Sequence, residues 1–386
     1  MNKANQVRIG IIGMGNMGAA HAANIREGKV PGLELAAVAD RDAGRLEKYG
    51  ELRTFTEGSE LIASASGALD AVLIATPHYE HTTLGIAALE AGLHTLVEKP
   101  ISVHKADCER LIEAHTDKKQ VFAAMFNQRT DPAYRKLREM IRGGELGAIR
   151  RINWIITDWY RTESYYRSGG WRATWAGEGG GVLLNQCPHN LDLLQWLFGM
   201  PSKVTAKCQF GRFHDIEVED AVTALLEYPD GATGVFITTT GEAPGTNRLE
   251  VAADRGKVVI EGESFRYFRT EQMVPEHLQS CPGFFAKPAT WNVEIPINGK
   301  GEQHIGIMKN FTNAILAGEE LLAPATEGIH SVELANAMLF SAFQNEPVEL
   351  PLDGRAYERV LKEKIAGSTY QKPEVTGKVA DLDGSF

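Results

Sequence analysis

The chain has 386 residues, of which 43% are hydrophobic and 23% are charged, and this ordinary globular composition excludes a fibrous or disordered protein. At roughly 100 to 200 residues per domain, the length predicts two domains. The formal net charge of −10 argues against nucleic acid as a partner, because a phosphate backbone would be repelled and no Lys/Arg cluster opposes that balance.

The cysteines and the start of the chain indicate a reducing compartment. Four cysteines, at positions 108, 187, 208 and 281, are scattered without a CxxC pair, which predicts free thiols. The six residues before the first apolar run are too few for a signal peptide, and no stretch approaches the ~20 apolar residues of a membrane span. We therefore expect a cytoplasmic protein without membrane contact.

The run VRIGIIGMGNMGAAHAANI predicts a short buried strand, a glycine-rich turn and a helix. Gly13, Gly15 and Gly18 form the G-x-G-x-x-G pattern of dinucleotide-binding proteins. The first would make the tight turn, the second would let the backbone approach a pyrophosphate, and the third would let the helix pack closely on the strand. Asn16 and Met17 at the start of the helix would offer backbone N–H groups to the phosphates.

A second apolar run, LELAAVAD, ends at Asp40, about 20 residues after the last of these glycines. A carboxylate at this point accepts hydrogen bonds from the adenosine ribose and repels a 2′-phosphate, so the sequence favours NAD over NADP. Arg41 leaves NADP open, because a guanidinium can either stack on adenine or hold a 2′-phosphate. The structural alternative for Asp40 is the cap of a helix in DAGRLEKYG.

Strand-like and helix-like segments alternate as far as residue 126, with strands over 70–76, 94–99 and 120–126 and helices over about 79–91 and 105–117. Buried apolar strands separated by helices predict a parallel, doubly wound sheet whose ligand lies at the carboxyl ends of the strands. Thr76, Pro77, Glu98 and Lys99 stand at such ends and are expected to line the cofactor crevice. We therefore place a Rossmann dinucleotide-binding domain over residues 1–126.

Four segments together resemble the Gfo/Idh/MocA family of NAD(P)-dependent sugar and polyol dehydrogenases: the glycine pattern, ATPHYEH, GLHTLVEKPIS and a later GGG-x-x-x-N-x-x-x-H. The resemblance covers nearly the whole chain. It implies an α/β protein whose C-terminal α+β domain, residues 127–386, binds substrate and carries a large, mainly antiparallel open sheet. It also implies a homo-oligomer, a dimer or a tetramer, built through this sheet.

The second half of the chain agrees with that sheet. DAVTALLEYPDGATGVFITTT contains two strand-like runs around P-D-G, and RLEVAADRGKVVIEG contains two more around D-R-G. Turns this short join antiparallel strands.

The resemblance maps the catalytic residues of the family onto Lys99 and His189. A hydride leaves a secondary alcohol only as the hydroxyl proton is removed, so a group titrating near neutral pH must contact that oxygen, and an ammonium can stabilise its negative charge. The family usually has Asp four residues before this histidine, whereas this chain has Asn185. An amide can orient a sugar hydroxyl but cannot hold a proton, so proton transfer would rest on His189 and Lys99. Asp192 could supply the missing orienting carboxylate, or it could equally be a helix-face residue.

The stretch LLNQCPHNLDLLQWL, residues 183–197, places Asn185, His189, Asp192 and Trp196 at helical spacing, which predicts one shared stripe of a helix. Pro188 would occupy the first turn of that helix or kink it. A histidine in such an apolar run is usually a hydrogen-bonded structural residue, and only its context favours catalysis here.

The preceding segment, DWYRTESYYRSGGWRATWAGEGGG, is rich in aromatic residues. Such rings suit a sugar, and we expect Tyr160 and Tyr165 to contact it together with Lys99, Asn185 and His189. The rings could instead fill a domain or subunit interface. Within this segment Trp171 and Arg172 resemble the part of the family that lies near the nicotinamide, so we assign them to the cofactor.

His78 and His81 form an H-x-x-H pair without a third ligand of suitable spacing, so no metal is expected. His81 is instead expected near the nicotinamide ribose. The sequence thus predicts an NAD-dependent dehydrogenase acting on a secondary hydroxyl of a sugar, glycoside, anhydrosugar or inositol. Two alternatives stay open, namely glycoside cleavage through transient oxidation by tightly held NAD followed by elimination, and a non-catalytic sensor of NAD or sugar.

Overall fold

The first part of the chain forms a parallel, doubly wound sheet, as predicted. The structure is a computed structural model and describes residues 6–372. Six parallel strands are ordered β3-β2-β1-β4-β5-β6, so the winding direction changes between β1 and β4. The strands are β1 (Val7–Ile12), β2 (Leu33–Ala39), β3 (Arg53–Phe55), β4 (Ala71–Ile74), β5 (His94–Val97) and β6 (Phe122–Ala124).

Four helices connect these strands. They are α1 (Asn16–Arg26), α2 (Gly58–Ala63), α3 (His78–Glu90) and α4 (Lys105–Glu113). The predicted strands end two residues too late, because β4, β5 and β6 end at Ile74, Val97 and Ala124. Thr76, Pro77, Glu98 and Lys99 consequently lie in loops at the carboxyl edge of the sheet.

The second sheet has nine strands in the order β14-β13-β12-β11-β7-β10-β9-β8-β15, and every pair is antiparallel except β7 with β10. The predicted antiparallel pairs around P-D-G and D-R-G are confirmed as β9 with β10 and β11 with β12. The strands are β7 (Ile149–Ile156), β8 (Lys203–Phe210), β9 (Glu219–Glu227), β10 (Thr233–Thr239), β11 (Asn247–Ala253), β12 (Gly256–Glu261), β13 (Ser264–Thr270), β14 (Thr290–Glu294) and β15 (Val348–Glu349).

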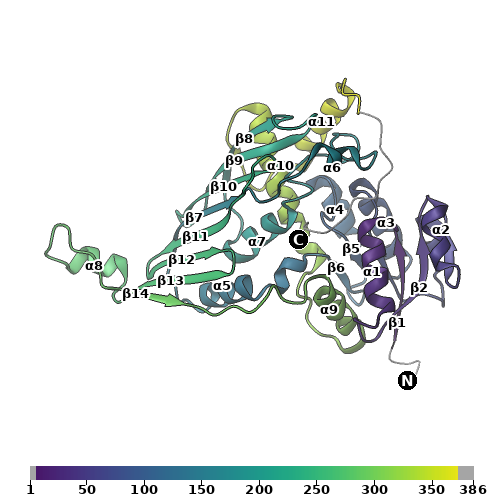
Figure 1. Cartoon of the computed structure of the whole chain (residues 1–386), viewed down its shortest axis with the longest axis horizontal. Helices are drawn as coiled ribbons and strands as arrows, with labels where there is room; N and C mark the ends of the chain where they lie inside the picture. Colours follow the sequence, from purple (N-terminus) through teal and green to yellow (C-terminus); the bar gives the residue numbers. More distant parts are fainter. Residues whose placement is uncertain (1–5, 373–386) are drawn as a thin grey trace.

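Helices fill the space between the two sheets. Figure 1 shows α5, α7 and α10 on the face of the nine-stranded sheet that is turned toward the first sheet. These and the remaining helices are α5 (Pro132–Arg142), α6 (Glu163–Arg167), α7 (Pro188–Phe198), α8 (Val274–Ser280), α9 (Gln303–Ala317), α10 (Gly328–Gln344) and α11 (Gly354–Ala366).

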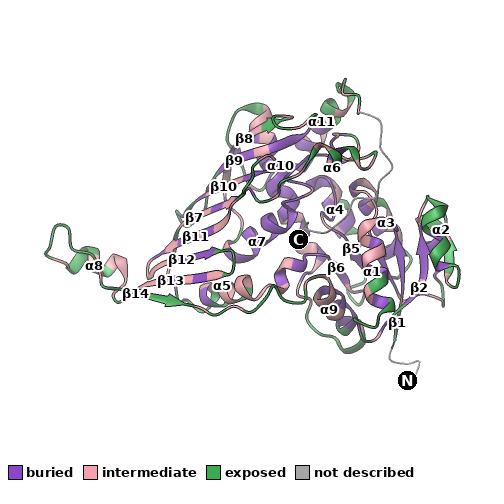
Figure 2. Cartoon of the chain, viewed as in Figure 1, coloured by how far each residue is buried: buried purple, intermediate pink, exposed green. Residues whose placement is uncertain are grey.

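The buried apolar side chains form two cores, one for each sheet. Figure 2 shows buried residues along the strands of both sheets and in α7 and α10 between them. The first core includes Ile307, Met308 and Phe311 of α9, although α9 follows eight of the nine strands of the second sheet in the chain. A unit cut at residue 126 would lack these side chains. The division of the chain into residues 1–126 and 127–386 therefore stays a prediction.

One segment extends away from both cores. Figure 1 shows α8 and the loop that leads to β14 projecting from the edge of the second sheet, and Figure 2 shows this loop as exposed. Phe284 and Phe285 at its tip are 98% and 95% exposed. Within residues 6–372, no helix combines the length and apolar character that crossing a membrane requires.

Candidate active site

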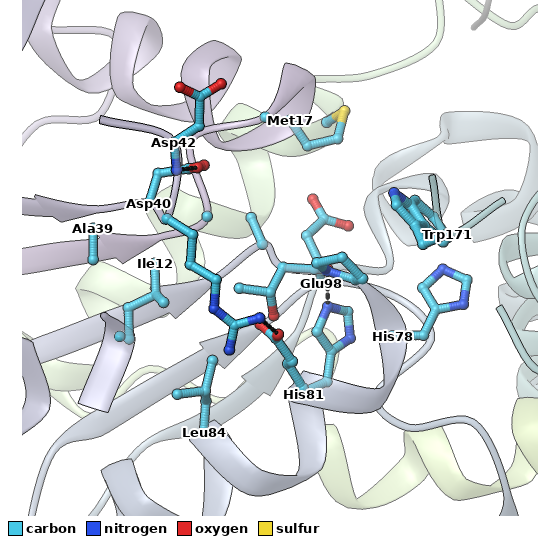
Figure 3. A pocket seen from close by; sticks show the side chains of 18 of the residues that line it. Ile12, Met17, Ala39, Asp40, Asp42, His78, His81, Leu84, Glu98 and Trp171 are labelled. Atoms are coloured by element: carbon cyan, nitrogen blue, oxygen red, sulfur yellow. Dashed lines mark hydrogen bonds and ion pairs between the residues drawn. The ribbon is translucent and has the colours of Figure 1, made fainter. Parts of the chain in front are cut away.

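A cavity of about 840 Å³ opens at the carboxyl ends of β1, β2, β4 and β5. All the residues that the sequence assigned to the cofactor line it, with the exception of Gly18. Figure 3 shows Asp40 and Met17 on one side of this cavity, His78 and Trp171 on the other, and Glu98 between them. The cavity therefore lies at the switch point of the sheet, where doubly wound folds bind their ligands.

The glycine turn has the geometry that a dinucleotide site needs. Gly13 has a φ of +92°, which favours glycine, and a methyl group there would lie 2.6 Å from the carbonyl oxygen of Ala75. A methyl group at Gly18 would lie 1.8 Å from the carbonyl oxygen of Gly13, so α1 can approach β1 only without a side chain there. At Gly15, by contrast, the nearest described atom is Nη1 of Arg45, at 3.8 Å.

This turn fits NAD. α1 begins after Gly15 without a side-chain cap among the described residues, so the positive end of the helix dipole faces a pyrophosphate bound at the turn. The Oγ1 atom of Thr76, in the wall of the same cavity, is buried without a hydrogen-bond partner in the described part of the chain. Gly13, Gly15, Asn16 and Met17 would hold the phosphates, and Thr76 has an unused donor to offer.

Asp40 ends β2 beside the glycine turn. Its Oδ2 accepts a hydrogen bond from the backbone N–H of Met14 at 2.6 Å, and its Oδ1 accepts from the N–H of Asp42 at 2.9 Å. The alternative that Asp40 caps a helix in DAGRLEKYG is wrong, because that segment forms two 3₁₀ turns, and the cap is Asp42, which accepts from the N–H of Gly44.

Arg41 is held by two carboxylates. Its Nη1 donates to Glu80 at 2.6 Å and its Nε donates to Glu57 at 3.4 Å, although the side chain is 70% exposed. A guanidinium whose charge is already paired is a weak ligand for a 2′-phosphate. The contacts of Arg41 therefore favour NAD, in agreement with the carboxylate of Asp40.

Glu98 is a buried residue in the wall of the cavity, next to Lys99. Its Oε1 lies 2.7 Å from Nε2 of His21, and its Oε2 accepts from the N–H of Lys99 at 3.1 Å. Burial acts to raise the pKa of Glu98, but the hydrogen bond and charge of His21 and the charges of His304 and Lys99 lower it to about 2. Lys99, which lines the cavity, therefore follows directly after an ionised carboxylate that hydrogen bonds hold in place.

The two histidines of H-x-x-H face different parts of the chain. His81 is buried, with Nδ1 at 2.7 Å from the carbonyl oxygen of Pro100 and Nε2 at 2.7 Å from that of Thr76. His78 lies 3.2 Å through Nδ1 from the carbonyl oxygen of Glu178 and packs against Trp171, with ring centroids 5.0 Å apart. Across residues 6–372, no group of three or more His, Cys, Asp or Glu side chains could hold a metal ion. The expected approach of His81 to the ribose stays a prediction.

Lys99, Asn185 and His189 come together although they are remote in sequence. Nζ of Lys99 donates to the backbone carbonyl of Asn185 at 2.8 Å. Lys99 and Asn185 line the cavity, while His189 is buried next to them, with its Nδ1 unpaired among the described residues and its ring edge-on to Phe126.

Burial sets the protonation of this group. Burial lowers the pKa of Lys99, and the charges of Arg172 and Arg161 lower it further against the opposing charge of Glu98. Burial also lowers the pKa of His189 well below its ordinary value, and the nearby charge of Lys99 adds to that effect. The imidazole is therefore neutral at neutral pH and can accept a proton, next to a cation that can stabilise an oxyanion.

The predicted stripe of Asn185, His189, Asp192 and Trp196 needs a correction. α7 begins at Pro188, so the proline occupies the first turn and Asn185 lies before the helix. Among the described residues Asp192 makes no hydrogen bond to His189, so its expected role as the orienting carboxylate is wrong, and it is a helix-face residue on the buried side of α7. It is buried, and both its oxygens accept from Arg129, at 2.6 and 2.7 Å.

The aromatic segment divides between the site and the core. Hydrogen bonds link the hydroxyl of Tyr165 to Oδ1 of Asn185 at 3.3 Å and to Nη1 of Arg172 at 2.6 Å. Tyr166 and Trp175 are buried in the second core. Tyr160 is 51% exposed, and among the described residues it is not part of the cavity wall. Its proposed contact with substrate stays a prediction, whereas Tyr165 directly contacts the candidate site.

Three polar residues near the site escaped the sequence analysis, namely His21, Glu178 and His304. His21 lies one helical turn after Gly18, on the face of α1 that packs against the sheet, and this spacing is a usable signal. Glu178 is a single charged residue next to the glycines in GEGGG. His304 lies about 5.5 Å from His21 between ring centroids, and no local pattern connects α9 with α1.

Two family models match the chain. Residues 7–126 match the oxidoreductase family with an NAD-binding Rossmann fold, and residues 134–259 match the GFO/IDH/MocA C-terminal domain. Together the matched residues make up more than half of the chain. The chain belongs to the GFO/IDH/MocA family. It is therefore an oxidoreductase with an NAD-binding Rossmann domain, as the resemblance implied.

Relatives within the GFO/IDH/MocA family cover most of the chain. The myo-inositol 2-dehydrogenase of Thermotoga maritima is 27% identical over 268 residues, which are 66% of this chain and 75% of that protein. The levoglucosan dehydrogenase of Pseudarthrobacter phenanthrenivorans is 25% identical over 401 residues, covering 89% of this chain and 98% of the relative. The WlbA dehydrogenase of Chromobacterium violaceum, solved with NADH and UDP-GlcNAcA, has a TM-score of 0.76 at 26% identity, covering 90% of this chain and 97% of that one.

Proposed function

We propose that this protein is an NAD-dependent dehydrogenase that oxidises a secondary hydroxyl of a sugar or cyclic polyol. The observation that carries the proposal is that Lys99, half-buried in the wall of the dinucleotide cavity and hydrogen-bonded to Asn185, lies close to a buried, neutral His189. The substrate class is supported by relatives named for myo-inositol and levoglucosan and by a structural neighbour that binds a nucleotide sugar.

The residues of the site divide the chemistry between them. NAD supplies the hydride acceptor when it is bound. Lys99 stabilises the negative charge that develops on the substrate oxygen, and His189 accepts the hydroxyl proton through its neutral imidazole. Asn185 and the Tyr165 hydroxyl that is hydrogen-bonded to it position the substrate next to these groups, and Trp171 faces the cofactor.

A screen of inositols, hexoses, anhydrosugars and glycosides with NAD and NADP in parallel tests the proposal. We expect NADH to accumulate with at least one cyclic polyol or sugar, and NADP to support less turnover because Asp40 repels a 2′-phosphate. Release of an aglycone without accumulation of NADH would instead favour cleavage through transient oxidation. Binding of NAD and sugar without any turnover would favour the sensor.

We also propose that the chain forms a homo-oligomer, a dimer or a tetramer, through its C-terminal sheet. Leu225 on the outward side of β9 is 56% exposed, and Phe284 and Phe285 on the projecting loop are almost fully exposed. Large apolar side chains left in water are typical of surfaces that associate. Sedimentation of the wild type and of a Phe284→Ser/Phe285→Ser variant tests this, and a monomeric wild type would contradict it.

A further inference from the structure

Glu178 is a buried carboxylate that contacts the candidate active site without lining the cavity. It is 1% exposed. Its Oε2 accepts a hydrogen bond from the backbone N–H of Ala173 at 2.7 Å, and its Oε1 accepts from Nδ2 of Asn185. Each carboxylate oxygen thus has its own donor, and only a side chain with two acceptor oxygens satisfies both the N–H of Ala173 and Nδ2 of Asn185.

The bond to Asn185 fixes which way its amide points. Because Nδ2 faces Glu178, Oδ1 faces the hydroxyl of Tyr165, which donates to it at 3.3 Å. The Tyr165 oxygen in turn accepts from Nη1 of Arg172 at 2.6 Å and from Nε2 of Gln186 at 3.0 Å. A single direction of donation therefore runs from Arg172 through Tyr165 and Asn185, and it ends on Glu178.

The bond to Ala173 holds a strained backbone. Ala173 has a φ of +67°, a left-handed conformation that a residue with a side chain rarely adopts, and its side chain is fully buried. This residue follows Trp171 and Arg172, both of which line the cavity. Glu178 therefore anchors the turn that directs these two side chains, as well as the amide next to Lys99.

The charges around Glu178 are mostly positive. Arg172 and Lys372 face it from its own loop and from the end of the described part of the chain, and the charge of Lys99, after the end of β5, also acts on it. Its other titratable neighbours include Glu219 of β9, the hydroxyl of Tyr166, and His78 of α3, whose Nδ1 lies 3.2 Å from the backbone carbonyl of Glu178. An ionised carboxylate at this place offsets part of the cationic charge that surrounds Lys99.

We propose that Glu178 is the positioning residue of this site: as a carboxylate it sets the direction of the hydrogen bonds from Arg172 to Asn185 and so places the Asn185 amide and its backbone carbonyl against Lys99. This inference rests on the proposed dehydrogenase function. It also explains how a site with an amide at position 185 keeps a negative charge close to Lys99.

Exchange of the two groups tests the proposal. Glu178→Gln leaves one acceptor for two donors, so an amide N–H must face either Ala173 or Asn185. Asn185→Asp places two carboxylates in contact, and they must share a proton. The double variant Glu178→Gln/Asn185→Asp satisfies every partner, because the new amide accepts from Ala173 and donates to the new carboxylate, which still accepts from Tyr165.

We expect each single substitution to lower kcat about 10- to 100-fold, the usual effect of removing a supporting hydrogen-bond partner from an active site. The double variant should recover most of that loss. The pH profile gives a second measurement, because burial raises the pKa of Glu178 above its ordinary value. The wild type should lose kcat as this carboxylate is protonated; Glu178→Gln should lose that acid limb, and the double variant should regain it.

Glu217→Gln is the matched control. Glu217 accepts from the N–H of Trp175 at 2.8 Å and so holds the same loop from the outside. We expect its kcat and pH profile to match the wild type. Equal losses in both Gln variants, or a Glu178→Gln enzyme with reduced thermal stability but unchanged kcat and pH profile, would overturn the proposal and leave Glu178 a structural residue.

A thermal unfolding cycle needs no substrate. It compares the wild type, Glu178→Gln, Asn185→Asp and the double variant. Coupled losses that the double variant recovers support the paired contact, and additive losses overturn the proposal. If the wild type oxidises no sugar or polyol, the proposed function fails, yet this cycle still decides whether positions 178 and 185 act as a pair.

Discussion

The turn between β1 and α1 and the segment 171–189 border the same cavity but are built in different ways. The turn consists of backbone, with Gly13 at a positive φ and Gly18 against the carbonyl of Gly13. The segment consists of side-chain hydrogen bonds that end on Glu178. The conformation of the turn depends on steric fit, whereas the conformation of the segment depends on the identity and protonation of a few polar groups. We therefore expect changes in the turn to alter cofactor binding, and changes in the segment and its partner Lys99 to alter turnover.

The largest effect should come from the residues that handle the proton. Lys99→Ala and His189→Ala should each lower kcat about 100- to 10,000-fold, the contribution expected of general acid–base groups, while NAD still binds. Steady-state kinetics and a titration of NADH fluorescence measure the two properties separately. Full turnover in both variants would show that the proton leaves by another route.

In the turn, Gly18→Ala should damage both folding and binding. The new methyl group would lie 1.8 Å from a carbonyl oxygen, so α1 must move away from β1. We expect a destabilisation of about 1 to 3 kcal/mol and loss of NAD binding, because the first turn of α1 no longer faces the phosphates.

Gly50→Ala is a control for that substitution in the same sheet unit. Gly50 has a φ of −60°, and a methyl group there would lie 3.7 Å from its nearest neighbour, the carbonyl oxygen of Glu47. This variant should keep the wild-type melting temperature and NAD affinity. Wild-type NADH binding by Gly18→Ala would contradict the steric account of the turn.

Gly15→Ala sharpens the same comparison, because it separates binding from folding. Its methyl group would have only Arg45 near it, at 3.8 Å, so the folded protein accommodates it. The methyl group would occupy the space that a pyrophosphate approaches, and we expect about tenfold weaker NAD binding at an unchanged melting temperature. A destabilised variant, or one with unchanged affinity, would place the phosphates elsewhere.

Acid should weaken the protein through the buried histidines around the cavity, whereas the glycine turn itself offers no group to titrate. Burial lowers the pKa of His304, at the start of α9, to about 4, whereas a histidine in the unfolded chain titrates at about 6.5. Between these values the unfolded chain binds a proton that the folded protein does not, so the free energy of unfolding falls as the pH drops through this window. Burial lowers the pKa of His78 and His189 in the same direction.

Urea unfolding across that window measures the effect. His304→Gln should reduce the dependence of stability on pH relative to the wild type. Equal slopes for the wild type and His304→Gln would show that His304 is as easily protonated in the folded protein as in the unfolded chain.

The same contrast explains which features the sequence predicts. Alternating apolar strands, glycine positions and short turns are local signals, and they predicted the first sheet, two antiparallel pairs of the second sheet and the loops around one cavity, while the family resemblance implied the large second sheet. The partner of Asp192 is Arg129, 63 residues away, and only the packing of α7 brings them together. Glu178 is close to Asn185 in sequence, but the loop between them has no period from which a contact could be inferred. The side-chain site thus depended on tertiary packing.

The smallest effect should come from the end of the described chain, where Lys372 reaches the site segment from outside. Its Nζ donates to the backbone carbonyls of Gly169 and of Arg172, the latter at 2.8 Å, and both residues line the cavity. Lys372→Ala should raise the KM for NAD about 2- to 10-fold, the value of one hydrogen bond or two weak ones, with kcat nearly unchanged.

Lys362→Ala removes the same charge from the surface of α11, where Nζ of Lys362 contacts only Glu358 at 2.8 Å among the described residues, so it controls for net charge. If both variants raised KM equally, the effect would come from long-range charge. If Lys372→Ala instead lowered kcat as strongly as Glu178→Gln, the segment would respond to any loosening of its backbone, and the distinction between a steric turn and a chemically specified segment would not hold.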